Sequence, residues 1–115
     1  MEEKVKISIL FQLYGKLLTD KQFECIDDFY NNDLSLSEIA QNKDITRQAV
    51  RDNIQKGVKK LSEYEEKLGF MKKSIRQEKK IEKALLELTK IQKNYSDKKV
   101  EHILENVRKE LNDFI

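Results

Sequence analysis

SLSEIAQNKDITRQAVRDNIQKGVKKL, residues 35 to 61, contains two helix starts that lie close together, with no proline between them. The first is a capping box: Ser35 can accept from the amide of Glu38, while the Glu38 side chain reaches back to the Ser35 amide. The second is Thr46, a good N-cap residue. The pattern predicts a short helix over residues 36 to about 42, a turn at Lys43-Asp44, and a new helix after Thr46.

Apolar spacing indicates how these two helices pack. Leu36, Ile39 and Ala40 share one face of the first helix, and Ile45 can fill the angle between the helices. In the second helix the stripe facing inward consists of Ala49, Val50, Ile54, Val58 and Leu61. The polar front of this helix then faces outward, as in a helix-turn-helix recognition helix. The residues predicted to contact nucleic acid there are Thr46, Arg47, Gln48, Arg51, Gln55 and Lys59. An ordinary helical hairpin remains the alternative.

The segment before this motif predicts two more helices. The first carries an apolar stripe for the core, made of Ile7, Leu10, Phe11, Tyr14, Leu17 and Leu18. Its second stripe, Val5, Ile9 and Leu13, needs another partner, either the C-terminal half of the chain or a second protomer. Thr19 and Gln22 form a capping box that opens the next helix, with Phe23, Ile26 and Phe29 inward. Asn31-Asn32 is expected to end it in the left-handed conformation.

The C-terminal half predicts a helical hairpin. The stripe of the recognition helix continues through Tyr64 and Leu68 to Gly69, so we place a domain at residues 1–69 and a helical extension at 70–115. In the first helix of the extension the apolar line is Ile75, Ile81, Leu85, Leu88 and Tyr95. Ser96 or Asp97 caps the last helix, whose stripe is Val100, Ile103, Leu104, Val107, Leu111 and Phe114. This surplus of apolar surface predicts a homodimer, with Val5, Ile9, Leu13, Ile103, Val107 and Leu111 at the interface.

Basic residues follow one face of the first helix of the extension. Lys72, Arg76, Lys79 and Lys83 recur at helical spacing, and Lys73 and Lys80 lie beside them. We predict that these first four residues contact nucleic-acid phosphates. A solvated helix face, partly neutralised by Glu78 and Glu82, is the alternative.

Composition narrows the fold and the chemistry. Of 115 residues 38% are charged, none is proline and only three are glycine, which favours an all-α fold. His102 is the only histidine and Cys25 the only cysteine, so we expect neither a metal site nor a cofactor, and no enzymatic activity. Cys25 is expected in the core. No apolar run approaches the roughly 20 residues of a membrane span, which predicts a cytoplasmic protein.

Residues 35–61 resemble the fourth conserved region of sigma-seventy-type factors. That region pairs a capped S-L-x-E-I helix with an [IV]-T-R-x-x-[IV]-R recognition helix that ends in K-K-L. The chain departs from it at Lys43-Asp44, where such factors carry Leu-Gly. The resemblance implies a sigma-region-four-like helix-turn-helix domain followed by the helical hairpin. A complete sigma factor is not expected, because there is no room for its promoter-melting and core-binding regions.

FQLYGKLLTDKQ, SLSEIA, TRQAVRDNI and YEEKLG, in this order, resemble the YlxM family of low-GC Gram-positive bacteria over nearly the whole chain. The resemblance implies a dimeric, all-helical regulatory or accessory protein of the signal recognition particle pathway. Its partners would be DNA or the particle's RNA, together with the signal recognition particle GTPase or its receptor. The alternatives are a DNA-binding transcription regulator and a protein adaptor that binds the GTPase without nucleic acid.

Overall fold

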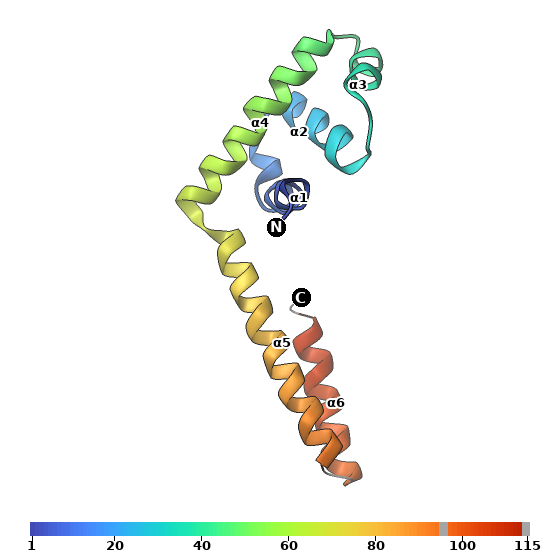
Figure 1. Ribbon diagram of the computed structural model, residues 1–115, viewed down its shortest axis with the longest axis vertical. Helices are drawn as coiled ribbons and strands as arrows, with labels where there is room; N and C mark the ends of the chain where they lie inside the picture. Colours follow the sequence, from blue (N-terminus) through green and yellow to red (C-terminus); the bar gives the residue numbers. More distant parts are fainter. Residues whose placement is uncertain (95–96, 114–115) are drawn as a thin grey trace. The chain divides into compact units, whose positions relative to one another are not determined.

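The chain folds into helices throughout the part that the computed structural model describes, residues 1–94 and 97–113 (Figure 1). Their order is α1 (Glu3–Tyr14), the 3-10 turn η1 (Gly15–Leu17), α2 (Asp20–Ile26), the π-helical turn η2 (Asp27–Asn31), α3 (Leu36–Lys43), α4 (Arg47–Leu68), α5 (Phe70–Asn94) and α6 (Lys98–Asn112). No strand occurs among the described residues. The all-α prediction is therefore confirmed.

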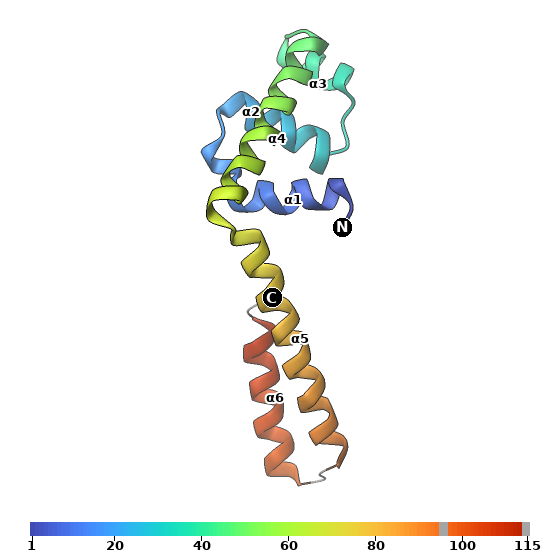
Figure 2. The same cartoon turned by 60° about the vertical axis from the view of Figure 1, so that its left-hand side comes forward.

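Two compact units make up the chain. The N-terminal unit comprises Met1–Met71, and the C-terminal unit begins at Lys72. Within the N-terminal unit, α1, α2 and α3 gather around the long helix α4, and each of them contacts it (Figure 2). Its core consists of Ile7, Leu10, Tyr14, Leu18, Cys25, Ile26, Ile39, Ala40, Val50, Ile54, Leu61 and Met71. Cys25 is fully buried, as predicted, and this burial raises the pKa of its thiol.

Both predicted capping boxes are present. At the start of α2, the Gln22 amide donates to Thr19 Oγ1 and the Thr19 amide donates to Gln22 Oε1, each at 3.2 Å. At the start of α3, the Glu38 amide donates to Ser35 Oγ and the Ser35 amide to Glu38 Oε1, each at 3.1 Å. Each box satisfies amides that the first helical turn leaves without a carbonyl partner.

Two helix ends, and the burial of one residue near a third, differ from the sequence-based expectation. The left-handed residue after the second helix is Asp33 (φ 55°), whereas Asn31 and Asn32 close the π-helical turn and donate their side-chain amides to Asp27 and Asp28. The first helix ends at Tyr14, so Leu17 leaves the predicted stripe and is 58% exposed. Leu68 is also exposed, because the inward position of the last turns of α4 belongs to Glu65.

A buried hydrogen-bond network joins α1 to the end of α4 and the first turn of α5. The Tyr14 hydroxyl donates to Glu65 Oε1 at 2.8 Å and accepts from the Phe70 amide at 3.1 Å. The same Glu65 oxygen accepts from the Met71 amide at 2.9 Å. Burial, and then the bond to Glu65, raises the pKa of Tyr14. This network secures the amides that follow Gly69, which ends α4 in the left-handed conformation (φ 67°), as predicted.

The C-terminal unit is a hairpin of α5 and α6. Figures 1 and 2 both show the two helices side by side and antiparallel. Of its described residues only Leu104 is buried, and the predicted lining residues Ile75, Ile81, Leu85, Leu88, Val100 and Leu111 are half-buried. Asp97 caps α6 by accepting from the Lys99 amide at 2.9 Å. The predictions for Tyr95, Ser96 and Phe114 lie outside the described residues.

The close contact of α2 and α4 depends on Gly57. A Cβ atom on Gly57 would clash with Cδ1 of Ile26, which is fully buried. We expect Gly57→Ala to destabilise the protein by about 1 kcal/mol, because overpacking costs about 1–3 kcal/mol and the gain in helix propensity offsets up to about 1. In an Ile26→Val background, which lacks Cδ1, the same change is expected to stabilise. Urea unfolding of the four proteins measures the coupling, and equal effects in both backgrounds would contradict this packing.

Candidate nucleic-acid interface

The turn between α3 and α4 is built around Asp44. This residue takes the left-handed conformation (φ 54°), which aspartate tolerates better than most non-glycine residues. The Ile45 amide then donates to the Ala40 carbonyl at 3.1 Å. Lys43 is the last residue of α3 and forms an ion pair with Glu24 of α2, which raises the pKa of its ammonium group. The predicted turn is therefore present, held against α2.

The start of α4 presents its polar side chains to solvent. Thr46 is the N-cap and accepts from the Ala49 amide at 3.0 Å, as predicted. Val50 and Leu61 are fully buried and Ile54 is 7% exposed, whereas Ile45 is only half-buried. The exposed residues are Thr46, Arg47, Gln48, Arg51, Gln55 and Lys59. Their outward orientation agrees with the sequence-based assignment, and their contact with nucleic acid stays a prediction.

A hollow of about 390 Å³ lies between the starts of α3 and α4. It is lined by Leu36, Ser37, Arg47, Gln48 and Arg51. Arg47 Nη1 donates to Ser37 Oγ in a long contact of 3.5 Å. Gln48 Nε2 donates to Asp52 Oδ1 at 3.0 Å, one turn further along α4. The sequence pattern singled out Arg47, Gln48 and Arg51 but missed Ser37, which enters the site only because α3 packs beside α4.

The predicted basic residues of α5 form a separate surface in the C-terminal unit. Lys72, Arg76, Lys79 and Lys83 are all exposed, and their spacing places them along one side of the helix. Lys73 and Lys80 are also exposed, as are Glu78 and Glu82. The surface can attract phosphates, although its two carboxylates reduce the local positive charge.

The residues predicted for dimerisation are largely accessible in the single chain. On α1, Val5 is 47% and Leu13 is 40% exposed, and Ile9 is half-buried. On α6, Ile103 is 60% and Val107 is 38% exposed. The residues of α6 that face α5 are instead Leu104, which is buried, and Arg108, which contacts Thr89. Leu111 is half-buried. Their role as an interface stays a prediction.

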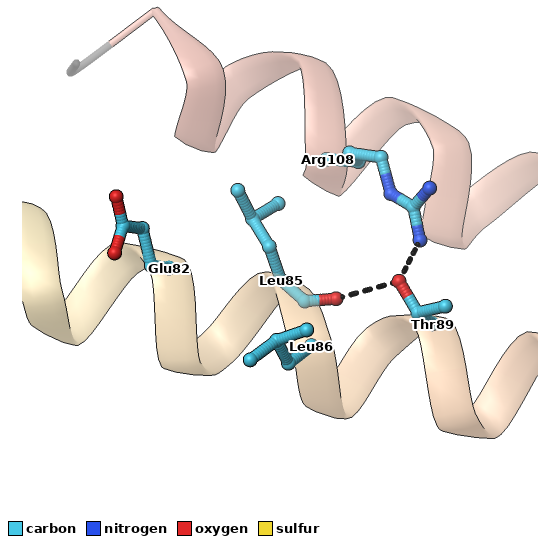
Figure 3. A pocket seen from close by; sticks show the side chains of 5 residues that line it. All are labelled: Glu82, Leu85, Leu86, Thr89 and Arg108. Atoms are coloured by element: carbon cyan, nitrogen blue, oxygen red, sulfur yellow. Dashed lines mark hydrogen bonds between the residues drawn. The ribbon is translucent and has the colours of Figure 1, made fainter.

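Arg108 forms a polar contact inside the hairpin that the sequence pattern did not predict. Its Nη2 donates to Thr89 Oγ1 at 2.7 Å, and Thr89 donates in turn to the Leu85 carbonyl at 2.9 Å (Figure 3). The same Nη2 also donates to Gln92 Oε1 at 2.8 Å. A hollow of about 420 Å³ lies beside this contact, lined by Glu82, Leu85, Leu86, Thr89 and Arg108. The contact joins α5 to α6, and Arg108 Nε is buried without a hydrogen-bond partner among the described residues.

Residues 1–94 and 97–113 contain neither a cluster of metal-binding side chains nor a membrane-spanning helix. These residues contain no group of three or more His, Cys, Asp or Glu side chains that could hold a metal ion. None of the helices in this part of the chain is long and apolar enough to cross a membrane.

Several known proteins match this chain over nearly all of their own length and of its length. The family model for helix-turn-helix proteins of the YlxM / p13-like type, UPF0122, matches residues 1–110. A UPF0122 protein of Fusobacterium nucleatum is 42% identical over 109 residues, which cover 93% of this chain and 97% of that protein. A UPF0122 protein of Clostridium kluyveri is 43% identical over 110 residues, 94% of each chain. One of Listeria welshimeri is 39% identical over 107 residues, 93% of this chain and 96% of that protein.

Proposed function

Because this chain belongs to the UPF0122 family of YlxM / p13-like helix-turn-helix proteins, we propose that it binds nucleic acid as a regulatory or accessory protein without catalytic activity. The observation that carries the proposal is the start of α4. There the side chains of Arg47, Gln48 and Arg51 are exposed, whereas Val50 is fully buried and fixes this end of α4 in the core. A helix capped by Thr46 and presented in this way can enter a major groove or lie along a phosphate backbone.

The proposed pathway is protein targeting by the signal recognition particle. It is supported by the resemblance of the sequence motifs to the YlxM family, and the proposed ligand is the particle's RNA or DNA. Two features favour RNA, or RNA together with DNA. The Asp52 carboxylate at the front of α4 weakens the fit of this helix to a DNA major groove, and the basic residues of α5 suit recognition through phosphates and shape.

A specific observation supports a second candidate function, that of a protein adaptor. Val5 and Leu13 expose apolar surface on one side of α1, and both side chains are 40% exposed or more. Apolar side chains that line up along an exposed helix face indicate a protein contact. That partner would be a second copy of the chain, the targeting GTPase or its receptor.

Binding titrations with two sets of variants test the proposal. One variant carries Arg47→Ala and Arg51→Ala, and the other replaces Lys72, Arg76, Lys79 and Lys83 by Gln. On signal recognition particle RNA we expect the affinity of the α5 variant to fall at least roughly tenfold. Each phosphate contact favours binding by releasing a counterion, and the variant loses these contacts. On random-sequence duplex DNA we expect the α4 variant to lose more, since arginines at the groove contact bases or phosphates. Anisotropy at two salt concentrations measures both.

The matched control removes four positive charges elsewhere, by changing Lys16, Lys21, Lys98 and Lys109 to Gln; all four are exposed. It should retain most of the affinity if the losses are local. If the parent protein binds neither nucleic acid below about 10 μM, a range in which non-specific DNA binding is common, the proposal is wrong and the adaptor function takes its place.

A further inference from the structure

We infer that the hollow between α3 and α4 seats one phosphodiester group of a nucleic-acid backbone, so that the front of α4 binds without reading the base sequence. The inference rests on the proposed function and specifies its chemistry. It concerns the hollow of about 390 Å³ that Leu36, Ser37, Arg47, Gln48 and Arg51 line.

The donors of this hollow suit a phosphate. Arg47 and Arg51 lie one helical turn apart on α4, so their guanidinium groups can approach the same group from one side. A guanidinium group binds phosphate oxygens through paired N–H donors and keeps its charge at every physiological pH. Arg47 Nη1 has only the long contact with Ser37, and the side chain of Arg51 has no hydrogen bond or ion pair within the described residues. The Ser37 hydroxyl, on the opposite wall, can donate to the same oxygen.

The same site is poorly equipped to read bases. A glutamine recognises adenine by using both its amide nitrogen and its amide oxygen. In this protein Gln48 Nε2 already donates to Asp52 Oδ1 at 3.0 Å, so reading adenine would require that bond to break. Gln55 lies two turns further along α4, whereas a recognition helix contacts base edges with its N-terminal residues. Either arginine alone could read a guanine. Because neither glutamine is placed to read adenine and both arginines border one hollow, we assign the arginines to a backbone phosphate.

Substituting Ser37 tests the hollow without removing an arginine. Ser37→Asp places a carboxylate in the hollow, in the first turn of α3, where a negative charge favours the helix. Ser62→Asp makes the same change of charge on an exposed position in the middle of α4. Circular dichroism melts establish that both variants are folded. We expect Ser37→Asp to weaken binding at least roughly tenfold, and Ser62→Asp less than about twofold, since an exposed distant charge is screened by salt.

The probes are three duplex DNAs of unrelated sequence and one RNA hairpin, each titrated with the full chain at several salt concentrations. We expect the affinities for the three DNAs to lie within about threefold of one another. Gln48→Ala should change each of these affinities by less than about twofold. Arg47→Ala with Arg51→Ala should lower the slope of log K against log salt by about 0.9 on every DNA, because the two arginines neutralise one phosphate. The effect of Ser37→Asp on binding of the RNA hairpin shows whether an RNA backbone occupies the same hollow.

Three results would overturn the inference. A preference of more than about tenfold for one DNA, lost in Gln48→Ala or in Arg47→Ala with Arg51→Ala, would show base reading instead. Equal effects of Ser37→Asp and Ser62→Asp would place the phosphate elsewhere. These first two results leave nucleic-acid binding intact, so they refute the hollow as a backbone site but not the proposed function. If no probe binds the parent protein, the inference and the proposed function are refuted together.

Discussion

Val50→Asp is expected to unfold the N-terminal unit. Val50 is fully buried where α4 packs on the other helices, so the substitution places an unpaired carboxylate in the core and removes a valine side chain. The expected loss is on the order of 5 kcal/mol, combining about 1.5–3 for the lost burial with the cost of an unpaired buried polar group. Small domains have a total stability of about 5–15 kcal/mol, so most or all of it would be lost.

Far-ultraviolet circular dichroism during thermal melts measures this loss. Ile39→Asp should behave similarly, because Ile39 is also fully buried, whereas Ile45→Asp should cost less, because Ile45 is only half-buried. Gln55→Asp is the matched control, since it introduces the same carboxylate on the exposed side of α4. A Val50→Asp melt that coincides with the control would show that the inward and outward sides of α4 are assigned wrongly.

Glu65→Ala should be the second most damaging substitution, with an expected loss of about 3–5 kcal/mol. The Glu65 carboxylate accepts from the Tyr14 hydroxyl at 2.8 Å and from the Met71 amide at 2.9 Å, and the residue is 9% exposed. Its removal leaves two donors in a buried region without this acceptor. Each unsatisfied buried donor costs about 1–3 kcal/mol, and bonds to a charged group contribute more than neutral ones.

Chemical denaturation of three variants separates the causes. Glu65→Gln retains an acceptor oxygen and should lose less than Glu65→Ala. Tyr14→Phe removes the hydroxyl that bridges Glu65 and the Phe70 amide, and should fall between Glu65→Ala and the parent. Glu66→Ala is the control, because the neighbouring Glu66 is exposed. Equal stability of Glu65→Ala and Glu66→Ala would exclude a structural role for the network.

Local features of the sequence determined where the helices begin and turn. The capping boxes at Thr19 and Ser35, the N-cap at Thr46 and the glycine at Gly69 all act through bonds within a few residues, so the residue types predict them directly. Periodicity likewise assigned Val50 and Ile54 to the core and Arg47 and Arg51 to the surface, because a helix repeats every 3.6 residues regardless of its neighbours.

Only the tertiary structure decided which apolar and charged residues depart from these rules. Leu17 and Leu68 lie on predicted stripes but are exposed, whereas Glu65 is buried because Tyr14 approaches it from α1. Gly57 is needed for helix packing, because Ile26 of α2 leaves no room for a Cβ atom at that position of α4. Ser37 enters the candidate site because α3 packs against α4. Each of these features depends on side chains from different helices that packing brings together. A local sequence pattern cannot predict which side chain from another helix will be the neighbour.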